Sequence, residues 1–385
     1  MIDMKHIYEI NTATWLSRLS QQYNQPITLA NVPDDEIDRL AKFGMDTVWL
    51  MGVWQRSPVA AEISRNDANF HAELRELLPD FTSDDIIGSA YAIKSYTIDE
   101  RFGGEAALQA FRRQLAARDM KLLLDFVPNH TAFDHPWVTE SPLRYITRDP
   151  SRVKDQTTHQ FRACGGVFVA KGQDPTLAPW NDVAQLNAFS KSYRAASIET
   201  LQYISTLADG VRCDMAMLLI NDIFSKTWGE LAGPVPSVEY WHEVIQSVRQ
   251  TSPTFTFIAE CYWETEAKLV ELGFDYVYDK TTYDYLARYN QTGAEYHLES
   301  LRAIENHLLH FLENHDEPRA SSLFSADESL LYVEFIKKLP GVCLWHDGQF
   351  EGYRKRVPVH IRRGPHEPVD EKLYGYYKQM LSTRP

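Results

Sequence analysis

The chain of 385 residues alternates short apolar runs with longer amphipathic stretches from one end to the other, and this pattern limits its fold more than any other feature. Apolar runs of strand length lie at 7–11, 47–51, 122–127, 210–214, 256–260, 276–278, 309–313 and 342–345. Stretches with helical periodicity lie at 35–43, 104–118, 190–207, 240–251 and 329–338, and a last helix is expected after Asp370. A strand followed by a helix, repeated eight times, is typical of a closed parallel barrel. The sequence therefore predicts an α/β fold of the (β/α)8 TIM-barrel class.

One long irregular segment interrupts the alternation. Residues 131–189 separate the third apolar run from the helix that follows it, and they are rich in Pro, Asp, Gly and Arg. Irregular loops of this length are uncommon inside a compact domain. We therefore expect residues 131–189 to form a small inserted subdomain over the mouth of the barrel, and residues 1–130 and 190–385 to form the barrel itself.

The composition argues against several partners and compartments. The formal net charge at pH 7 is −14, whereas nucleic acids and anionic membranes bind proteins through basic surfaces. A membrane-spanning helix would need a run of about 18 apolar residues, and the sequence has none. The first residues show no signal-peptide pattern, and the four cysteines are scattered singly. The sequence thus predicts a cytoplasmic protein with free thiols, and it leaves the oligomeric state open.

Charged side chains interrupt the apolar runs near their C-terminal ends. Asp125 lies in the third run, Asp214 and Glu260 end the fourth and fifth, and Asp316 follows the seventh. Barrel enzymes place their catalytic residues at this end of the strands. Carboxylates that converge on one barrel mouth also repel one another. Because this repulsion is costly, the grouping indicates a functional site rather than a structural one.

Two of these carboxyl groups have informative neighbours. Arg212 and Asp214 are two residues apart on one strand, so their side chains share a face, and the guanidinium is expected to lower the pKa of Asp214 and keep it ionised, as a nucleophile requires. Glu260 is followed by Tyr262 and Trp263, and a carboxyl group in an aromatic, partly dry site tends to keep its proton, as a general acid requires. A structural Arg–Asp pair and a glutamate bound to helix N-terminal amides are the alternatives.

Five segments, in order along the chain, resemble the motifs of the alpha-amylase superfamily of glycoside hydrolases. Residues 125–130 (DFVPNH), 210–216 (GVRCDMA) and 314–316 (NHD) are similar to its motifs on strands three, four and seven. Glu260 stands where that family keeps its acid on strand five, and residues 182–187 (DVAQLN) resemble a motif near the end of its inserted subdomain. The resemblance covers nearly the whole chain and implies a retaining glycoside hydrolase that acts on a small-molecule carbohydrate.

The resemblance also implies a role for each matching residue. Asp214 would be the nucleophile, Glu260 the general acid/base, and Asp316 the group that stabilises an oxocarbenium-like transition state. Arg212 would orient Asp214, and the other substrate-binding residues would hold or stack on the sugar. The residues implied to bind substrate are Tyr91, His130, Arg212 and His315, and those implied to support the mouth are Asp125, Asn129, Gln185 and Asn187.

Departures from the family pattern narrow the expected substrate. Met217 and Leu218 stand where starch-degrading members often carry Lys-His, a pair used for acceptor-side sugars and for a calcium ion. Together with the subdomain, this predicts cleavage of small α-glucosides or short oligosaccharides, no metal site and no cofactor. The family's C-terminal β-sandwich is expected to be absent. The basic stretch at 354–363 is expected to be a solvated surface.

Two other functions are compatible with the same residues. An α-glucosyl transferase or a phosphorylase would use the same three carboxylates, with a sugar or phosphate in place of water. A non-catalytic carbohydrate-binding relative is the more remote alternative, because such proteins usually lose part of the carboxylate set.

Overall fold

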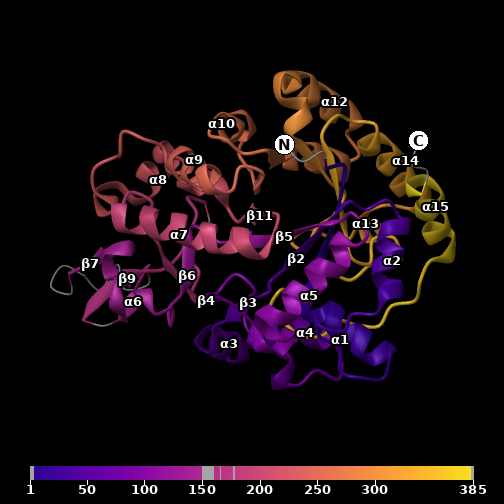
Figure 1. The fold of residues 1–385 in the computed structure, drawn as a ribbon, viewed down its shortest axis with the longest axis horizontal. Helices are drawn as coiled ribbons and strands as arrows, with labels where there is room; N and C mark the ends of the chain where they lie inside the picture. The colour runs from indigo at the N-terminus through magenta and orange to yellow at the C-terminus, as the bar shows by residue number, and fades with distance from the viewer. Residues whose placement is uncertain (1–3, 150–159, 165, 177, 383–385) are drawn as a thin grey trace.

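Parallel strands close into a barrel in the computed structural model, which describes residues 4–149, 160–164, 166–176 and 178–382 (Figure 1). Its eight strands are β1 (His6–Asn11), β2 (Thr47–Met51), β5 (Lys121–Phe126), β11 (Gly210–Cys213), β12 (Thr256–Ala259), β13 (Tyr276–Tyr278), β14 (Leu308–His310) and β15 (Val342–His346). They follow one another around the barrel, and β1 closes it by pairing with both β2 and β15. The eight predicted strands and the TIM-barrel class are confirmed, with strand ends displaced by at most three residues.

Helices pack around the outside of the barrel (Figure 1). They include α1 (Thr12–Gln22), α2 (Asp34–Lys42), α5 (Gly104–Ala116), α7 (Lys191–Leu207), α8 (Asn221–Trp228), α9 (Tyr240–Thr251), α10 (Glu266–Glu271), α11 (Lys280–Ala287), α12 (Gln291–Ser300), α14 (Ala326–Lys337) and α15 (Glu371–Leu381). Helix α5 shows why they form: Leu108, Phe111 and Leu115 recur at helical spacing and are buried. The predicted helices are confirmed within three residues at each end.

The barrel strands are buried on both faces, as expected for parallel strands covered by helices. Every residue of β2 is buried, for example. Trp49, within β2, and Trp54, just after it, are among the largest fully buried side chains. Because this packing is rigid, side chains at the C-terminal ends of the strands are held in fixed relative positions.

Residues 131–189 contain small sheets of their own. Strands β6 (His130–Ala132) and β10 (Val183–Gln185) pair antiparallel, and β9 (Val167–Ala170) lies between β7 (Thr147–Arg148) and β8 (Phe161–Cys164). A short helix, α6 (Trp137–Glu140), lies near them at one side of the barrel (Figure 1). Residues 150–159, 165 and 177 of the expected subdomain lie outside the described residues. The division at residues 131 and 189 stays a prediction.

A second elaboration lies between β2 and α5, where the sequence predicted none. It contains α3 (Pro58–Arg65), α4 (Ala68–Leu77) and an antiparallel pair formed by β3 (Trp54–Arg56) and β4 (Ile93–Ile98). The chain between β15 and α15, drawn in yellow, passes along this region before it returns to α15 (Figure 1). No helix within the described ranges is both long enough and apolar enough to cross a membrane.

Candidate active site

A cavity of about 540 Å³ opens at the C-terminal ends of the barrel strands. Asp214, Glu260 and Asp316, the three carboxylates singled out from the sequence, line it together with Tyr91 and His130. The size lies within the range of about 300–1,000 Å³ that is usual for ligand sites. The remaining lining residues are Ser89, Asp174, Thr176, Trp180, Asp182, Val183, Met215, Tyr262, Trp263 and His360. Its walls therefore come from widely separated parts of the chain, including the 131–189 segment.

A single buried guanidinium holds two of the carboxyl groups. Arg212 Nη1 lies 2.7 Å from Asp214 Oδ1, and Nη2 lies 2.9 Å from Glu260 Oε1. Arg212 Nε donates a hydrogen bond of 3.3 Å to the hydroxyl of Tyr278, and the guanidinium packs over the ring of Trp49. Arg212 is only 1% exposed, so its planar fork is fixed by packing. Asp214 and Glu260 are thereby fixed relative to each other.

The charge state of Asp214 differs from the one predicted. Burial, together with the neighbouring charge of Glu260, raises the pKa of Asp214 to about 7. Arg212 lowers it, as the sequence suggested, but does not outweigh these two effects. The expectation of a low pKa was wrong because one guanidinium is shared by two buried carboxyl groups.

Glu260 is buried and surrounded by hydrogen-bond donors. The backbone N–H of Met215 donates to Oε2 at 2.5 Å, and the hydroxyl of Tyr262 donates to Oε1 at 2.8 Å. Met215 adopts a left-handed conformation with φ 45°, where the chain turns out of β11. From the sequence, Tyr262 was recognised only as an aromatic neighbour of Glu260, and Met215 was not recognised at all. No local pattern shows that the turn after one strand contacts a side chain at the end of the next strand.

The third carboxylate belongs to a network centred on His315. Its Nε2 atom lies 3.1 Å from Asp316 Oδ2 and 2.7 Å from the hydroxyl of Tyr91, and its Nδ1 atom contacts Glu9 Oε1. Burial opposes protonation of His315, but Asp316 and Glu9 raise its pKa well above the usual value. Burial acts likewise against ionisation of Asp316, yet His315 keeps the pKa of Asp316 below its usual value. The Asp316 side chain is 44% exposed, so its charge faces the cavity.

Glu9 is a site residue that the sequence analysis missed. It is fully buried in β1 and contacts both His315 and His346, the latter at 3.1 Å. A signal was present, because a glutamate inside the apolar run from Ile7 to Ile10 is costly to bury without partners. The two histidines that compensate it lie more than 300 residues away in the chain.

His130 lines the cavity, whereas Asp125 is absent from its lining. The His130 ring packs edge-on against Trp180 with ring centres 5.3 Å apart, and burial lowers its pKa to about 4, so this imidazole is neutral. Asp125 accepts hydrogen bonds from Trp49 Nε1 at 3.1 Å and from the Gly52 N–H at 2.8 Å. Burial raises the pKa of Asp125 to about 6. The supporting role that was predicted for Asp125 stays a prediction.

The other supporting residues tie the inserted segment to the barrel. Gln185 Nε2 donates to Asn129 Oδ1 at 2.9 Å and to the Asn129 carbonyl at 3.0 Å, which joins β10 to the end of β5. Asn187 lies apart from the cavity lining and donates to the Ala232 carbonyl at 3.2 Å. The roles of these residues stay predictions.

Met217 and Leu218 do not face the cavity. They are 0% and 3% exposed and pack in the core. These two residues therefore give the prediction of a small substrate no direct support. Met215, Tyr262 and Trp263, in contrast, are among the residues that line the cavity. In the described part of the chain, no three His, Cys, Asp or Glu side chains are grouped in a way that could hold a metal ion.

Known proteins match this chain along most of its length. Residues 34–363 match the family model described as alpha amylase, catalytic domain. Alpha-amylase MalA of Haloarcula japonica is 24% identical over 389 residues, which cover 98% of this chain and 48% of that protein. Alpha-amylase 3 of Dictyoglomus thermophilum is 23% identical over 311 residues, which cover 75% of this chain and 58% of that protein. The chain thus spans about half the length of these curated relatives.

The solved structures that resemble the chain support the same architecture. An alpha-amylase from Lactobacillus plantarum has a TM-score of 0.66 and 22% sequence identity, with 98% of this chain and 80% of that chain covered. At this identity the likeness concerns the fold.

Proposed function

The chain belongs to the alpha-amylase family of glycoside hydrolases, and we propose that it hydrolyses α-glucosidic bonds of small α-glucosides or short oligosaccharides with retention of configuration. The observation that carries the proposal is the shared guanidinium of Arg212, which holds Asp214 and Glu260 at 2.7 and 2.9 Å. Retaining glycosidases need a nucleophile and an acid/base about 5–5.5 Å apart, and a guanidinium fork that binds both groups supports a close pair of this kind.

In the first step, the ionised carboxylate of Asp214 attacks the anomeric carbon. The bond between that carbon and the leaving oxygen breaks as Glu260 gives this oxygen a proton, and a glycosyl ester forms on Asp214. The ester separates the two half-reactions.

In the second step, Glu260 accepts a proton from water while the water oxygen attacks the same carbon. The ester bond breaks and Asp214 is released. The product has the configuration of the substrate because the carbon is inverted twice.

The positive charge that develops on the sugar ring is stabilised by Asp316. Its carboxylate is ionised, faces the cavity and is held by His315. His315 is in turn held as an imidazolium by Glu9, and it presents Nε2 next to Tyr91. A fixed negative charge of this kind stabilises an oxocarbenium-like transition state without reorganisation.

The size of the cavity supports a small substrate. About 540 Å³ accommodates a ligand of a few rings, and Trp180, Trp263 and Tyr262 supply flat apolar surfaces at its walls. The other expected sugar contacts are Tyr91, His130 and His315.

A panel of disaccharides and maltooligosaccharides, assayed with and without phosphate, tests the reaction class. We expect glucose as the product in both conditions, and proton NMR of the first product should show the α anomer. Formation of β-glucose would refute retention. Glucose 1-phosphate in the presence of phosphate would indicate a phosphorylase, and longer oligosaccharides would indicate a transferase.

A further inference from the structure

Residues 357–363, which we call the strap, lie between β15 and α15 in the chain. The strap pairs with residues 85–90, which precede β4. Ile361 forms an antiparallel bridge with Ile86, the Ile87 N–H donates to the His360 carbonyl at 2.8 Å, and the Arg362 N–H donates to the Asp85 carbonyl at 2.9 Å. Two segments from distant parts of the chain are thereby joined by backbone hydrogen bonds.

Buried charged groups fix both ends of the strap. Asp85 is 1% exposed and accepts bonds from Arg362 Nε at 3.0 Å and from Arg363 Nε at 2.9 Å. On the other side, Arg56 Nη1 donates to the carbonyls of Gly88 at 2.8 Å and Val359 at 2.5 Å. The expectation that the basic stretch is only a solvated surface is thus wrong for Arg362 and Arg363, because both bind a buried carboxylate.

Apolar packing holds the strap from below. Ile361 belongs to a hydrophobic cluster with Leu74, Leu77, Leu78 and Ile86, separate from the main core. The ring of His360 packs edge-on against Phe70 of α4, with ring centres 5.2 Å apart. The strap therefore occupies a fixed position.

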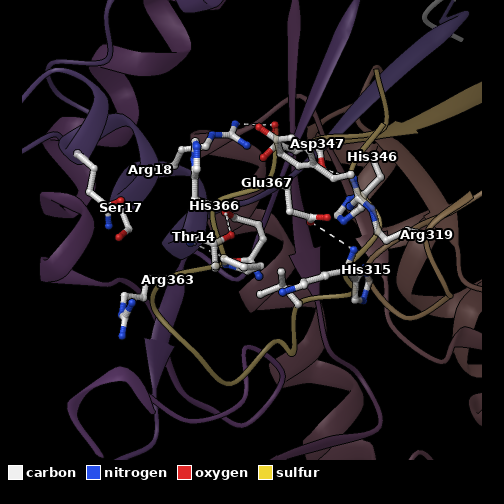
Figure 2. Close-up of a pocket in the computed structure, with 17 residues that line it drawn as sticks. Thr14, Ser17, Arg18, His315, Arg319, His346, Asp347, Arg363, His366 and Glu367 are labelled. Carbon is white, nitrogen blue, oxygen red and sulfur yellow. Dashed lines mark hydrogen bonds and ion pairs between the residues drawn. The ribbon is translucent and has the colours of Figure 1, made fainter. Parts of the chain in front are cut away.

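Different residues of the strap line two different cavities. His360 lines the catalytic cavity, whereas Val357 and Arg363 line a second cavity of about 90 Å³. Figure 2 shows this second cavity, with Arg18 of α1 and Asp347 after β15 among its labelled residues. The strap therefore lies between the catalytic cavity and the second cavity.

The proposed mechanism indicates which end of the substrate would contact the strap. Glu260 protonates the leaving oxygen, so the leaving group lies on its side, towards Tyr262 and Trp263. The sugar that carries the attacked carbon lies on the other side, towards Tyr91. The next sugar in that direction would meet His360.

We propose that the strap closes this end of the catalytic cavity, so that the enzyme removes single glucose units from non-reducing ends and cannot cleave within a glucan chain. The proposal rests on the proposed function and specifies its mode of action. A blind pocket accepts a terminal sugar and excludes one that carries a further substituent.

The wild-type protein is tested with 4-nitrophenyl maltoheptaoside in two forms, one free and one blocked at the non-reducing end by a 4,6-ethylidene group. We expect the blocked form to react at least about 100-fold more slowly, since an excluded group loses the whole binding interaction. Maltohexaose should give glucose and maltopentaose as its first products. Maltose or maltotriose among the first products, or equal turnover of the two heptaosides, would overturn the proposal.

Variants test the strap itself. The double variant Arg362→Ala/Arg363→Ala removes its anchors on Asp85 and should let the blocked heptaoside react, while turnover of α-glucosyl fluoride stays within about twofold because this substrate does not reach the strap. Arg354→Ala is the matched control from the same basic stretch and should leave the blocked substrate unreactive. A folded double variant that still rejects the blocked substrate would contradict the role of the strap. If the double variant does not fold, the first products that the wild type forms from maltohexaose test the proposal. Failure of the wild type to hydrolyse α-glucosyl fluoride would instead refute the proposed function.

Discussion

Replacing Glu260 with Gln removes one negative charge beside Asp214 and keeps the size of the side chain. In the native site, burial and the charge of Glu260 raise the pKa of Asp214 to about 7, with both groups bound to Arg212. Asp214 thus keeps a proton up to about pH 7. The reactive form is the one with this proton on Glu260.

The expected size of the effect follows from the repulsion between the two charges. At the separation of about 5.5 Å typical of retaining glycosidases, two negative charges repel by about 3 kcal/mol with an effective dielectric constant of about 20. One pH unit corresponds to about 1.4 kcal/mol, so the repulsion is worth about two units. Since a neutral neighbour makes ionisation of Asp214 easier, Glu260→Gln should lower its pKa by one to two units.

The assay compares kcat/KM as a function of pH, because this quantity reports the free enzyme. With a disaccharide, the wild type should lose activity above about pH 7, where this proton is lost. With α-glucosyl fluoride, which needs no acid, Glu260→Gln should retain activity at high pH, and its acid limb should lie one to two units below pH 7. On the disaccharide this variant should be nearly inactive.

Two results would refute this reasoning. If Glu260→Gln still lost activity on the fluoride above pH 7, the loss of wild-type activity above pH 7 would not come from the proton that Glu260 donates. If the variant lost activity equally on the fluoride and the disaccharide, Glu260 would have a role other than proton transfer.

Asp214→Asn should raise the melting temperature more at pH 8 than at pH 5. The pKa of Asp214 is raised in the folded state, so its ionisation at high pH destabilises the fold by up to about 4 kcal/mol. Equal shifts of the melting temperature at both pH values would contradict this. Glu9→Gln should lower the free energy of unfolding, measured in urea, by about 3–5 kcal/mol and should also reduce kcat/KM. The reason is that the variant leaves the buried His315 and His346 without their shared carboxylate. A change in the free energy of unfolding below about 0.5 kcal/mol would count against this role of Glu9. Prolonged treatment with a calcium chelator should leave melting temperature and activity unchanged, and a fall of several degrees that calcium reverses would show that a calcium site exists.

The barrel could be predicted from the sequence because its signals are local. Each strand is a short apolar run and each helix has its own periodicity, so neither depends on distant residues. The three carboxylates were found for a related reason: parallel barrel strands present their C-terminal ends at one face, and Asp214, Glu260 and Asp316 all lie at such ends.

The features that the sequence did not reveal all depend on contacts between distant segments. The bond from the Met215 N–H to Glu260, the contact of Glu9 with His315 and the anchoring of Arg362 on Asp85 join residues 45 to 306 positions apart. The pKa of Asp214 was misjudged for the same reason, since its immediate neighbour Arg212 was visible and the burial was not. Local patterns identify which residues are unusual, and tertiary packing decides what they face.

The identity of the nucleophile is the central claim, and rescue of a disabled variant by azide tests it most directly. Asp214→Gly removes the carboxylate and opens space for a small anion beside the anomeric carbon. With an activated α-glucoside, the variant alone should lose nearly all turnover, and added azide should restore turnover and give β-glucosyl azide, because a single attack inverts the carbon. Near-normal activity of Asp214→Gly without azide, or rescue by azide only when Asp316 is replaced, would contradict the assignment of Asp214 as the nucleophile.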